Sequence, residues 1–252
     1  TGQFNSAWWG HEMIECQVLR RNGAIMAGAS LITRKIPVVG SGIAFAKWGP
    51  AWRRGGMPAD PEDARAFIRE MQRHYCEERG FHLTIMPAAL PGHDETLCRI
   101  LVEEGFSEGE GFAAPERYLV NTGQAADAMI ASLDQKWRYN LKKAKKHEFK
   151  IEFVDGDEGI DAFNHLYDQM HDRKKFLDSS AIDCLGMLMR TEAPAFRPRV
   201  VLVSHEGRVT AGGVFAISGE IATYMFGATD DRALRLRAGY AMHGWVAEHL
   251  CA

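Results

Sequence analysis

A dense run of basic side chains lies in the middle of the chain, between positions 136 and 146. At about 100° per residue of an α-helix, Arg138, Lys142 and Lys145 form one stripe, and apolar side chains occupy the opposite side. Several cations along one stripe can hold the phosphate groups of a ligand through charge-assisted hydrogen bonds. The same pattern is also typical of a helix face that is simply solvated. Both interpretations remain open from these residues alone.

Aromatic side chains form a second candidate site, on a predicted strand in the last third of the chain. Tyr224 and Phe226 alternate with Met225, so one face of this strand must be core. A tyrosine hydroxyl can donate a hydrogen bond to a carbonyl oxygen that gains negative charge during acyl transfer. Tyr224 could equally be a strand tyrosine whose hydroxyl lies in water. Lys47 and Trp48 occupy the similar place on an earlier strand.

The sequence gives no support for a metal centre or a covalent nucleophile. It contains neither an HExxH nor a GxSxG pattern, and His243 and His249 do not share a helix face well. The five cysteines form no CxxC pair, so we expect reduced cysteines that mostly pack in the interior. The net charge is −3, and neither a signal peptide nor a membrane-spanning segment is visible. We therefore predict a cytoplasmic protein that has no metal or bound cofactor, binds no DNA and does not insert into membranes.

The elements that must position these side chains form an internal repeat. Each copy has two apolar strands joined by a tight turn, Asn22-Gly23 in one and Glu206-Gly207 in the other. In each, Ala-Gly follows four residues after the turn glycine, and a third strand and a helix come next. Self-similarity of this kind predicts two copies of one supersecondary unit. The predicted third strands and helices are Ile43–Trp48 with 61–79, and Ile221–Phe226 with 232–250.

The two copies predict an α+β fold with mixed sheets flanked by helices, divided into residues 1–123 and 124–252. The first copy continues through a strand, a helix and a final strand at 117–120, whereas the second reaches residue 252 within its helix. We therefore expect the second unit to be incomplete at its C-terminal side. A helical connector precedes the second meander, and Ser132 with Gln135 reads as a capping box at the start of its basic helix.

This order of elements resembles two tandem Gcn5-related acyltransferase units, as in the FemABX family of peptidyltransferases. The connector, from Leu133 to Lys146, is the best local match, and nearly the whole chain takes part. Shorter matches are the segment Ser6–Gly10, the turn Trp48-Gly49-Pro50, the strand Phe81–Met86 with Pro87, the segment Tyr224–Thr229, and Ala238–Ala241. The pyrophosphate loop of simple acyl-CoA enzymes has only a degenerate counterpart at Leu236–Ala241, where Leu takes the first position. No long helical arm fits within the second half.

The resemblance implies an acyltransferase that forms an amide bond, with aminoacyl transfer to a cell-wall (peptidoglycan) precursor as the leading expectation. Aminoacyl-tRNA or an acyl thioester would be the co-substrate. From the chemistry of its hydroxyl we predict that Tyr224 is the catalytic residue. Because the connector helix must span the two halves, we also expect the substrate cleft to lie between them, bordered by Arg138, Lys142 and Arg173. Arg173 closes a predicted helix, where a cation is favourable in any case, but the family often has an arginine here. An N-acyltransferase that uses acyl-CoA or a carrier thioester, and a non-catalytic tandem binding module, remain alternatives. The substrate-binding set is Lys47, Trp48, Arg138, Lys142, Lys145, Arg173 and Phe226.

Overall fold

The computed structural model describes residues 13–36, 40–53, 58–88, 94–109, 118–175, 181–219 and 221–251. The chain divides into two compact units, Thr1–Glu116 and Arg117–Ala252, whereas the sequence placed the division between residues 123 and 124. The predicted motif Ser6–Gly10 lies outside the described residues. Each unit has its own sheet and its own core, so each is described by itself.

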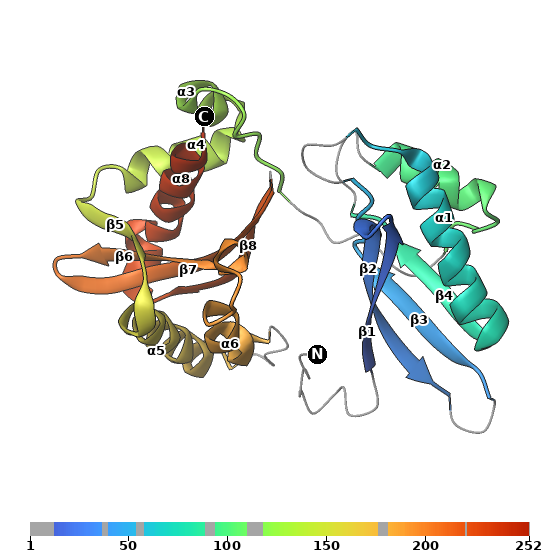
Figure 1. The fold of residues 1–252 in the computed structure, drawn as a ribbon. Helices are drawn as coiled ribbons and strands as arrows, with labels where there is room; N and C mark the ends of the chain where they lie inside the picture. The colour runs from blue at the N-terminus through green and yellow to red at the C-terminus, as the bar shows by residue number, and fades with distance from the viewer. Residues whose placement is uncertain are drawn as a thin grey trace. The chain divides into compact units, whose positions relative to one another are not determined.

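Unit 1 is a four-stranded mixed sheet with helices on one face (Figure 1). The strand order is β1-β2-β3-β4, with β3 and β4 parallel and the other pairs antiparallel. Its core is one cluster in which Leu31, Phe67 and Ile100 are at most 3% exposed. The elements are β1 (Met13–Arg21), β2 (Ala24–Lys35), β3 (Gly42–Lys47), α1 (Pro61–Met71), the π-helix η1 (Gln72–Glu78), β4 (Phe81–Met86) and α2 (Asp94–Glu103).

Unit 2 is an antiparallel sheet with helices on both faces (Figure 1). Strands lie in the order β5-β6-β7-β8, and one core cluster packs under α5 and another under α8. The elements are α3 (Ala126–Ser132), α4 (Gln135–Ala144), β5 (Phe149–Val154), α5 (Gly156–Lys174), the 3-10 helix η2 (Ile182–Cys184), α6 (Leu185–Met189), η3 (Pro194–Phe196), β6 (Arg199–His205), β7 (Arg208–Ser218), β8 (Ile221–Thr229), α7 (Asp231–Leu236) and α8 (Ala238–Leu250).

The predicted repeat is confirmed down to its irregularities. Strands β1, β2 and β3 correspond to β6, β7 and β8, and in each unit the ladder of the first hairpin shifts register just before the turn. Both turns have two residues at positive φ, 51° and 81° at Asn22-Gly23 and 51° and 76° at Glu206-Gly207. This backbone matches the twist of the flanking strands. Unit 1 adds the parallel strand β4, and the described residues of unit 2 add β5 at the opposite edge instead.

Several local predictions were wrong. Residues 118–120 form no strand. Their side chains are exposed, and their main chain pairs with no described strand. The N-cap of α4 is Asp134, which accepts from the main-chain N–H groups of Lys136 and Trp137, and not Ser132. The predicted helix over 232–250 is broken at Arg237, which has φ of 59° and separates α7 from α8.

The cysteines are free, but their predicted burial was wrong. Cys16, Cys76 and Cys98 are exposed, and Cys184 and Cys251 are partly exposed. No helix of the described ranges is long and apolar enough to cross a membrane.

Candidate functional site

A β-bulge determines where the two aromatic candidates of β8 lie. Tyr224 pairs with Phe215 and Phe226 pairs with Val214, so Met225 is an extra residue on β8. The bulge reverses the alternation, which places Tyr224 on the α8 face of the sheet and Phe226 on the α5 face. Phe226 is 7% exposed and belongs to the core under α5. It therefore takes no part in the site proposed below.

Tyr224 is held by ring contacts and by a glycine. Its ring centroid lies 5.2 Å from that of Phe215 and 4.5 Å from that of His243. Its hydroxyl lies over Gly227, where an added Cβ would come within 1.4 Å of the Tyr224 oxygen. Tyr224 remains 45% exposed, although desolvation by its neighbours raises the pKa of its hydroxyl to about 12. The phenol is therefore protonated at neutral pH and can donate a hydrogen bond.

His243 is the residue that sequence reasoning missed. It lies on α8, and its ring meets that of Tyr224 edge-on at 75°. Burial lowers the pKa of its imidazole, so the ring is neutral at pH 7 and has one nitrogen free to accept a proton. The sequence allowed only a test of whether His243 and His249 share a helix face. The closeness of His243 to Tyr224 depends on how α8 packs against β8, which the sequence does not show.

The predicted basic stripe is partly used inside unit 2. Arg138 donates to the main-chain oxygens of Ala131 and Leu133, which end α3. Lys145 forms an ion pair with Glu248 on α8 at 2.6 Å. Lys142 is exposed and makes no ion pair within the described part of the chain.

Arg173 is likewise engaged within unit 2. Its guanidinium donates to the main-chain oxygen of Thr229 at 2.8 Å and lies 3.0 Å from the carboxylate of Asp231. These contacts tie the C-terminal end of α5 to the end of β8. Arg173 therefore supports the strand that carries Tyr224, and whether it also binds substrate stays a prediction.

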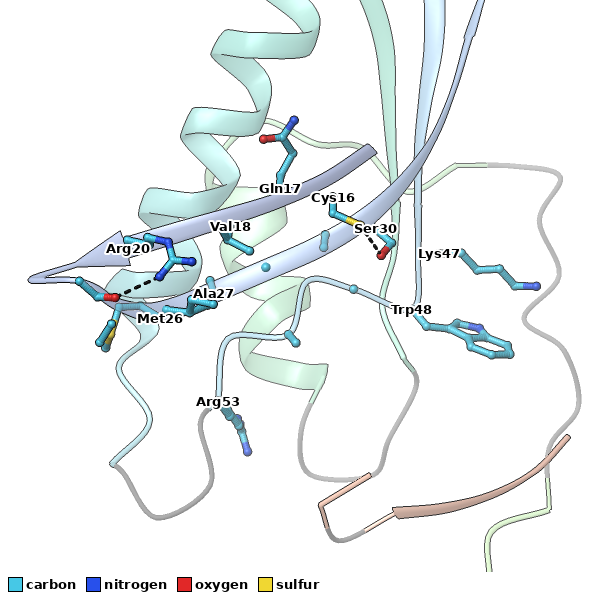
Figure 2. Close-up of a pocket in the computed structure, with 17 residues that line it drawn as sticks. Cys16, Gln17, Val18, Arg20, Met26, Ala27, Ser30, Lys47, Trp48 and Arg53 are labelled. Carbon is cyan, nitrogen blue, oxygen red and sulfur yellow. Dashed lines mark hydrogen bonds between the residues drawn. The ribbon is translucent and has the colours of Figure 1, made fainter. Parts of the chain in front are cut away.

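Lys47 and Trp48 line a cavity of about 840 Å³ on the helix-free face of the unit 1 sheet (Figure 2). Strands β1 and β2 form its floor, and the segment from Trp48 to Arg53 crosses its rim. Trp48 has φ of 60°, which is unusual for a bulky residue, and its side chain remains 43% exposed. The ammonium of Lys47 lies 4.7 Å from the centre of the Trp48 ring. Backbone positions in such sparsely populated conformations cluster at active sites and ligand-binding sites.

The charged side chains that line this cavity are all positive. Arg20 and Arg53 line it together with Lys47, and no acidic residue is among its described lining residues. Arg20 is oriented by a hydrogen bond of 3.0 Å to the main-chain oxygen of Gly23. The cavity can therefore receive an anionic group together with a flat or apolar one.

Within the residues that the structure describes, no group of three or more His, Cys, Asp or Glu side chains could hold a metal ion. The polar side-chain groups of the two candidate regions include hydroxyl, imidazole, carboxamide, ammonium and guanidinium groups. These groups suit hydrogen bonding and proton transfer.

Comparisons with known proteins agree with this architecture. Residues 131–252 match the family described as acetyltransferase (GNAT) domain. The crystal structure of FemX is 13% identical, with a TM-score of 0.72 over 96% of this chain and 77% of that one. The C-terminal domain of a putative lysylphosphatidylglycerol synthetase from Agrobacterium fabrum is 12% identical, with a TM-score of 0.54 over 96% of this chain and 67% of that one. No curated protein matches the chain. The chain thus has a tandem Gcn5-related fold similar to that of FemX, and residues 131–252 match the model of an acetyltransferase (GNAT) domain.

Proposed function

We propose that the protein forms an amide bond by moving an aminoacyl group from an activated ester to the amine of a phosphate-bearing acceptor, such as a cell-wall precursor. The observation that carries this proposal is the protonated hydroxyl of Tyr224 on the bulged strand of the acyltransferase domain, beside the neutral ring of His243. The FemX likeness supports the kind of reaction through its fold.

The chemistry requires alignment and oxyanion stabilisation more than a strong base. The acceptor amine attacks the carbonyl carbon of the donor, and the carbonyl oxygen gains negative charge. The hydroxyl of Tyr224 donates a hydrogen bond to that oxygen. His243 accepts the proton that the amine loses, and the proton then passes to the departing ester oxygen. Because the leaving group is already good, no covalent intermediate on the protein is required.

The unit 1 cavity supports a role in holding the acceptor. A phosphate group could bind to one of the cations that line the cavity, such as Lys47, and a base or sugar could stack on the neighbouring Trp48. A volume of about 840 Å³ accommodates a nucleotide-sized group.

Transfer from acyl-CoA or a carrier thioester is the second candidate, favoured by the match to the GNAT family. The N-terminus of α8 is open at Gly239, where an added Cβ would meet no atom within 4 Å. Main-chain N–H groups at such a helix end attract a pyrophosphate. The two candidate functions differ in the acyl donor, which is an aminoacyl ester in the first and an acyl thioester in the second.

The test is a turnover assay with mass-spectrometric detection of the amide product. Aminoacyl-tRNA and acyl-CoA are offered separately, with a UDP-linked muropeptide as acceptor. Tyr224→Phe is expected to lower kcat about 100-fold, because one oxyanion donor is lost, and to leave the melting temperature nearly unchanged. Tyr118→Phe, at an 87% exposed tyrosine, is the matched control. Full activity of Tyr224→Phe refutes the assignment of Tyr224. Product only from acyl-CoA selects the second candidate, and absence of turnover with every donor supports the non-catalytic alternative.

A further inference from the structure

The outward face of α4 carries a compact set of lysines around one tyrosine. At about 100° per residue, the four of these side chains that lie on α4 fall within roughly 120° of the helix circumference, and Lys146 follows in the turn after Ala144. All are exposed except Lys143, which is partly exposed, and Tyr139 is 55% exposed. We call this surface the α4 lysine stripe; it consists of Lys136, Tyr139, Lys142, Lys143 and Lys146.

The packing of α4 determines which way the stripe points. Leu141 and Ala144 are at most 3% exposed, and Leu141 contacts α8 closely at Gly244, where an added Cβ would come within 2.6 Å of it. Asn140 accepts a hydrogen bond of 2.8 Å from Arg237. The helix therefore cannot rotate to bury the stripe without losing these contacts, and the lysines stay directed outward.

The stripe keeps its charge. Lys136, Lys142 and Lys146 make no ion pair with any described residue, and α4 contains no acidic residue. Arg138 and Lys145, on the flank of the same helix, are engaged by the protein itself. With a net charge of −3, the whole chain has no general attraction for anions. The positive potential is therefore local, and it is concentrated where no internal partner reduces it.

The chemistry of the stripe fits one class of partner. From Lys136 to Lys143 the helix rises roughly 10 Å, enough to follow a few phosphates of one strand, and Lys146 follows two residues after the helix ends. The ammonium of Lys143 lies 5.4 Å from the centre of the Tyr139 ring, which presents a flat surface among the cations. An aromatic ring among lysines is the combination that binds unpaired nucleotides, through base stacking and phosphate contacts.

We infer that the α4 lysine stripe is a docking surface for single-stranded nucleic acid. The inference does not depend on the proposed acyl transfer, since it concerns binding and involves neither Tyr224 nor the unit 1 cavity. An anionic membrane fits less well, because an interfacial helix needs large apolar side chains beside its cations and the stripe has only Tyr139.

The test is fluorescence anisotropy of the full chain with a labelled oligouridylate over a series of salt concentrations. The triple variant Lys136→Gln, Lys142→Gln, Lys146→Gln is expected to bind about tenfold or more weakly at low salt. The slope of log affinity against log salt should fall by about 0.7 for each lysine removed. Tyr139→Ala should weaken binding while leaving that slope unchanged, because it removes stacking and no charge.

Matched variants keep the inference open to refutation. Lys150→Gln, Lys174→Gln, Lys175→Gln removes the same charge from unit 2 outside the stripe, and Tyr118→Ala removes another exposed tyrosine. Both should bind the oligouridylate as the unchanged chain does. The inference is overturned if the unchanged chain does not bind, or if the control triple loses as much affinity as the stripe triple. Stripe-dependent binding to phosphatidylglycerol vesicles without binding to the oligouridylate also overturns it.

Discussion

Tyr224 owes its position to one extra residue in β8. Without the bulge at Met225, Tyr224 and Phe226 would share a face, and a tyrosine would lie in the core under α5. With it, Tyr224 meets His243 and keeps its hydroxyl over the main chain of Gly227. The pKa of Tyr224 is raised and that of His243 is lowered, so both groups are neutral at pH 7. The hydroxyl can then donate a hydrogen bond and the imidazole can accept a proton.

Lys47 should contribute to acceptor affinity and not to the chemical step. Lys47→Ala is expected to raise the KM for a phosphate-bearing acceptor about tenfold with little change in kcat, because one charge-assisted hydrogen bond is lost. Initial-rate kinetics over a range of acceptor concentrations measure this. Lys35→Ala, at an exposed lysine that does not line the cavity, is the control. An equal effect of both variants would mean that only the overall charge matters.

His243 should make the stability of the protein depend on pH. Burial lowers the pKa of its imidazole in the folded state, so the unfolded chain binds a proton at a pH where the folded chain does not. Stability due to this group is therefore complete above the unfolded pKa of about 6.5 and is lost as the pH falls below it. Urea unfolding at pH 7.5 and pH 5.5 should show a smaller loss for His243→Gln than for the unchanged chain. An equal loss in both would mean that the imidazole titrates normally.

At the scale of elements, β8 and α4 each combine a packing face with a chemical face. The α5 side of β8 supplies core residues such as Phe226, while its α8 side supplies Tyr224. Helix α4 buries Leu141 and Ala144 and presents its lysines on the other side. In both elements the packing of the buried side chains determines the direction of the candidate functional ones. A substitution on the buried side can therefore change the orientation of the candidate side chains without contacting them.

Gly227→Ala tests the coupling between the bulged strand and Tyr224. The new methyl group would require the Tyr224 hydroxyl to move, because only 1.4 Å separates the two positions. We expect kcat to fall nearly as far as in Tyr224→Phe, and the change in ring environment should appear in the near-ultraviolet circular dichroism. Gly109→Ala is the control, because an added Cβ there also meets open space. Unchanged kcat in Gly227→Ala would show that the hydroxyl can act from another position.

At the scale of the whole molecule, two units of similar topology hold separate cores. The cluster around Leu31 contains only residues of unit 1, and the clusters under α5 and α8 contain only residues of unit 2. Cooperative unfolding follows shared buried contacts, so the units should lose protection independently. The candidate groups belong to different units, the cavity to unit 1 and Tyr224 to unit 2.

Leu31→Ala tests this independence. Leu31 is 0% exposed, and its truncation should cost about 3 kcal/mol in unit 1 through lost burial and the cavity left behind. Hydrogen exchange followed by mass spectrometry should then show faster exchange across β1 to β4 and unchanged exchange across β5 to β8. Equal acceleration in both sheets would mean that the chain unfolds as one cooperative unit.

The sequence by itself determined the elements and their repetition. Glycine after Asn22 and after Glu206 sets two hairpin turns by its backbone freedom, and apolar strands on either side then form two meanders. Helix periodicity likewise identified the two sides of α4, because burial of Leu141 and Ala144 follows directly from their spacing. These features depend on local backbone preference and on the period of hydrophobicity, and both can be read along the chain.

Only the tertiary structure decided which of the candidate groups meet. Arg138, Lys142 and Lys145 are alike in the sequence, yet Arg138 caps the end of α3, Lys145 pairs with Glu248 and Lys142 stays exposed. The bulge that separates Tyr224 from Phe226, and the approach of His243 to Tyr224, depend on pairing with β7 and packing of α8. Such contacts join residues far apart in the chain, and their geometry depends on all the side chains that fill the space between the elements.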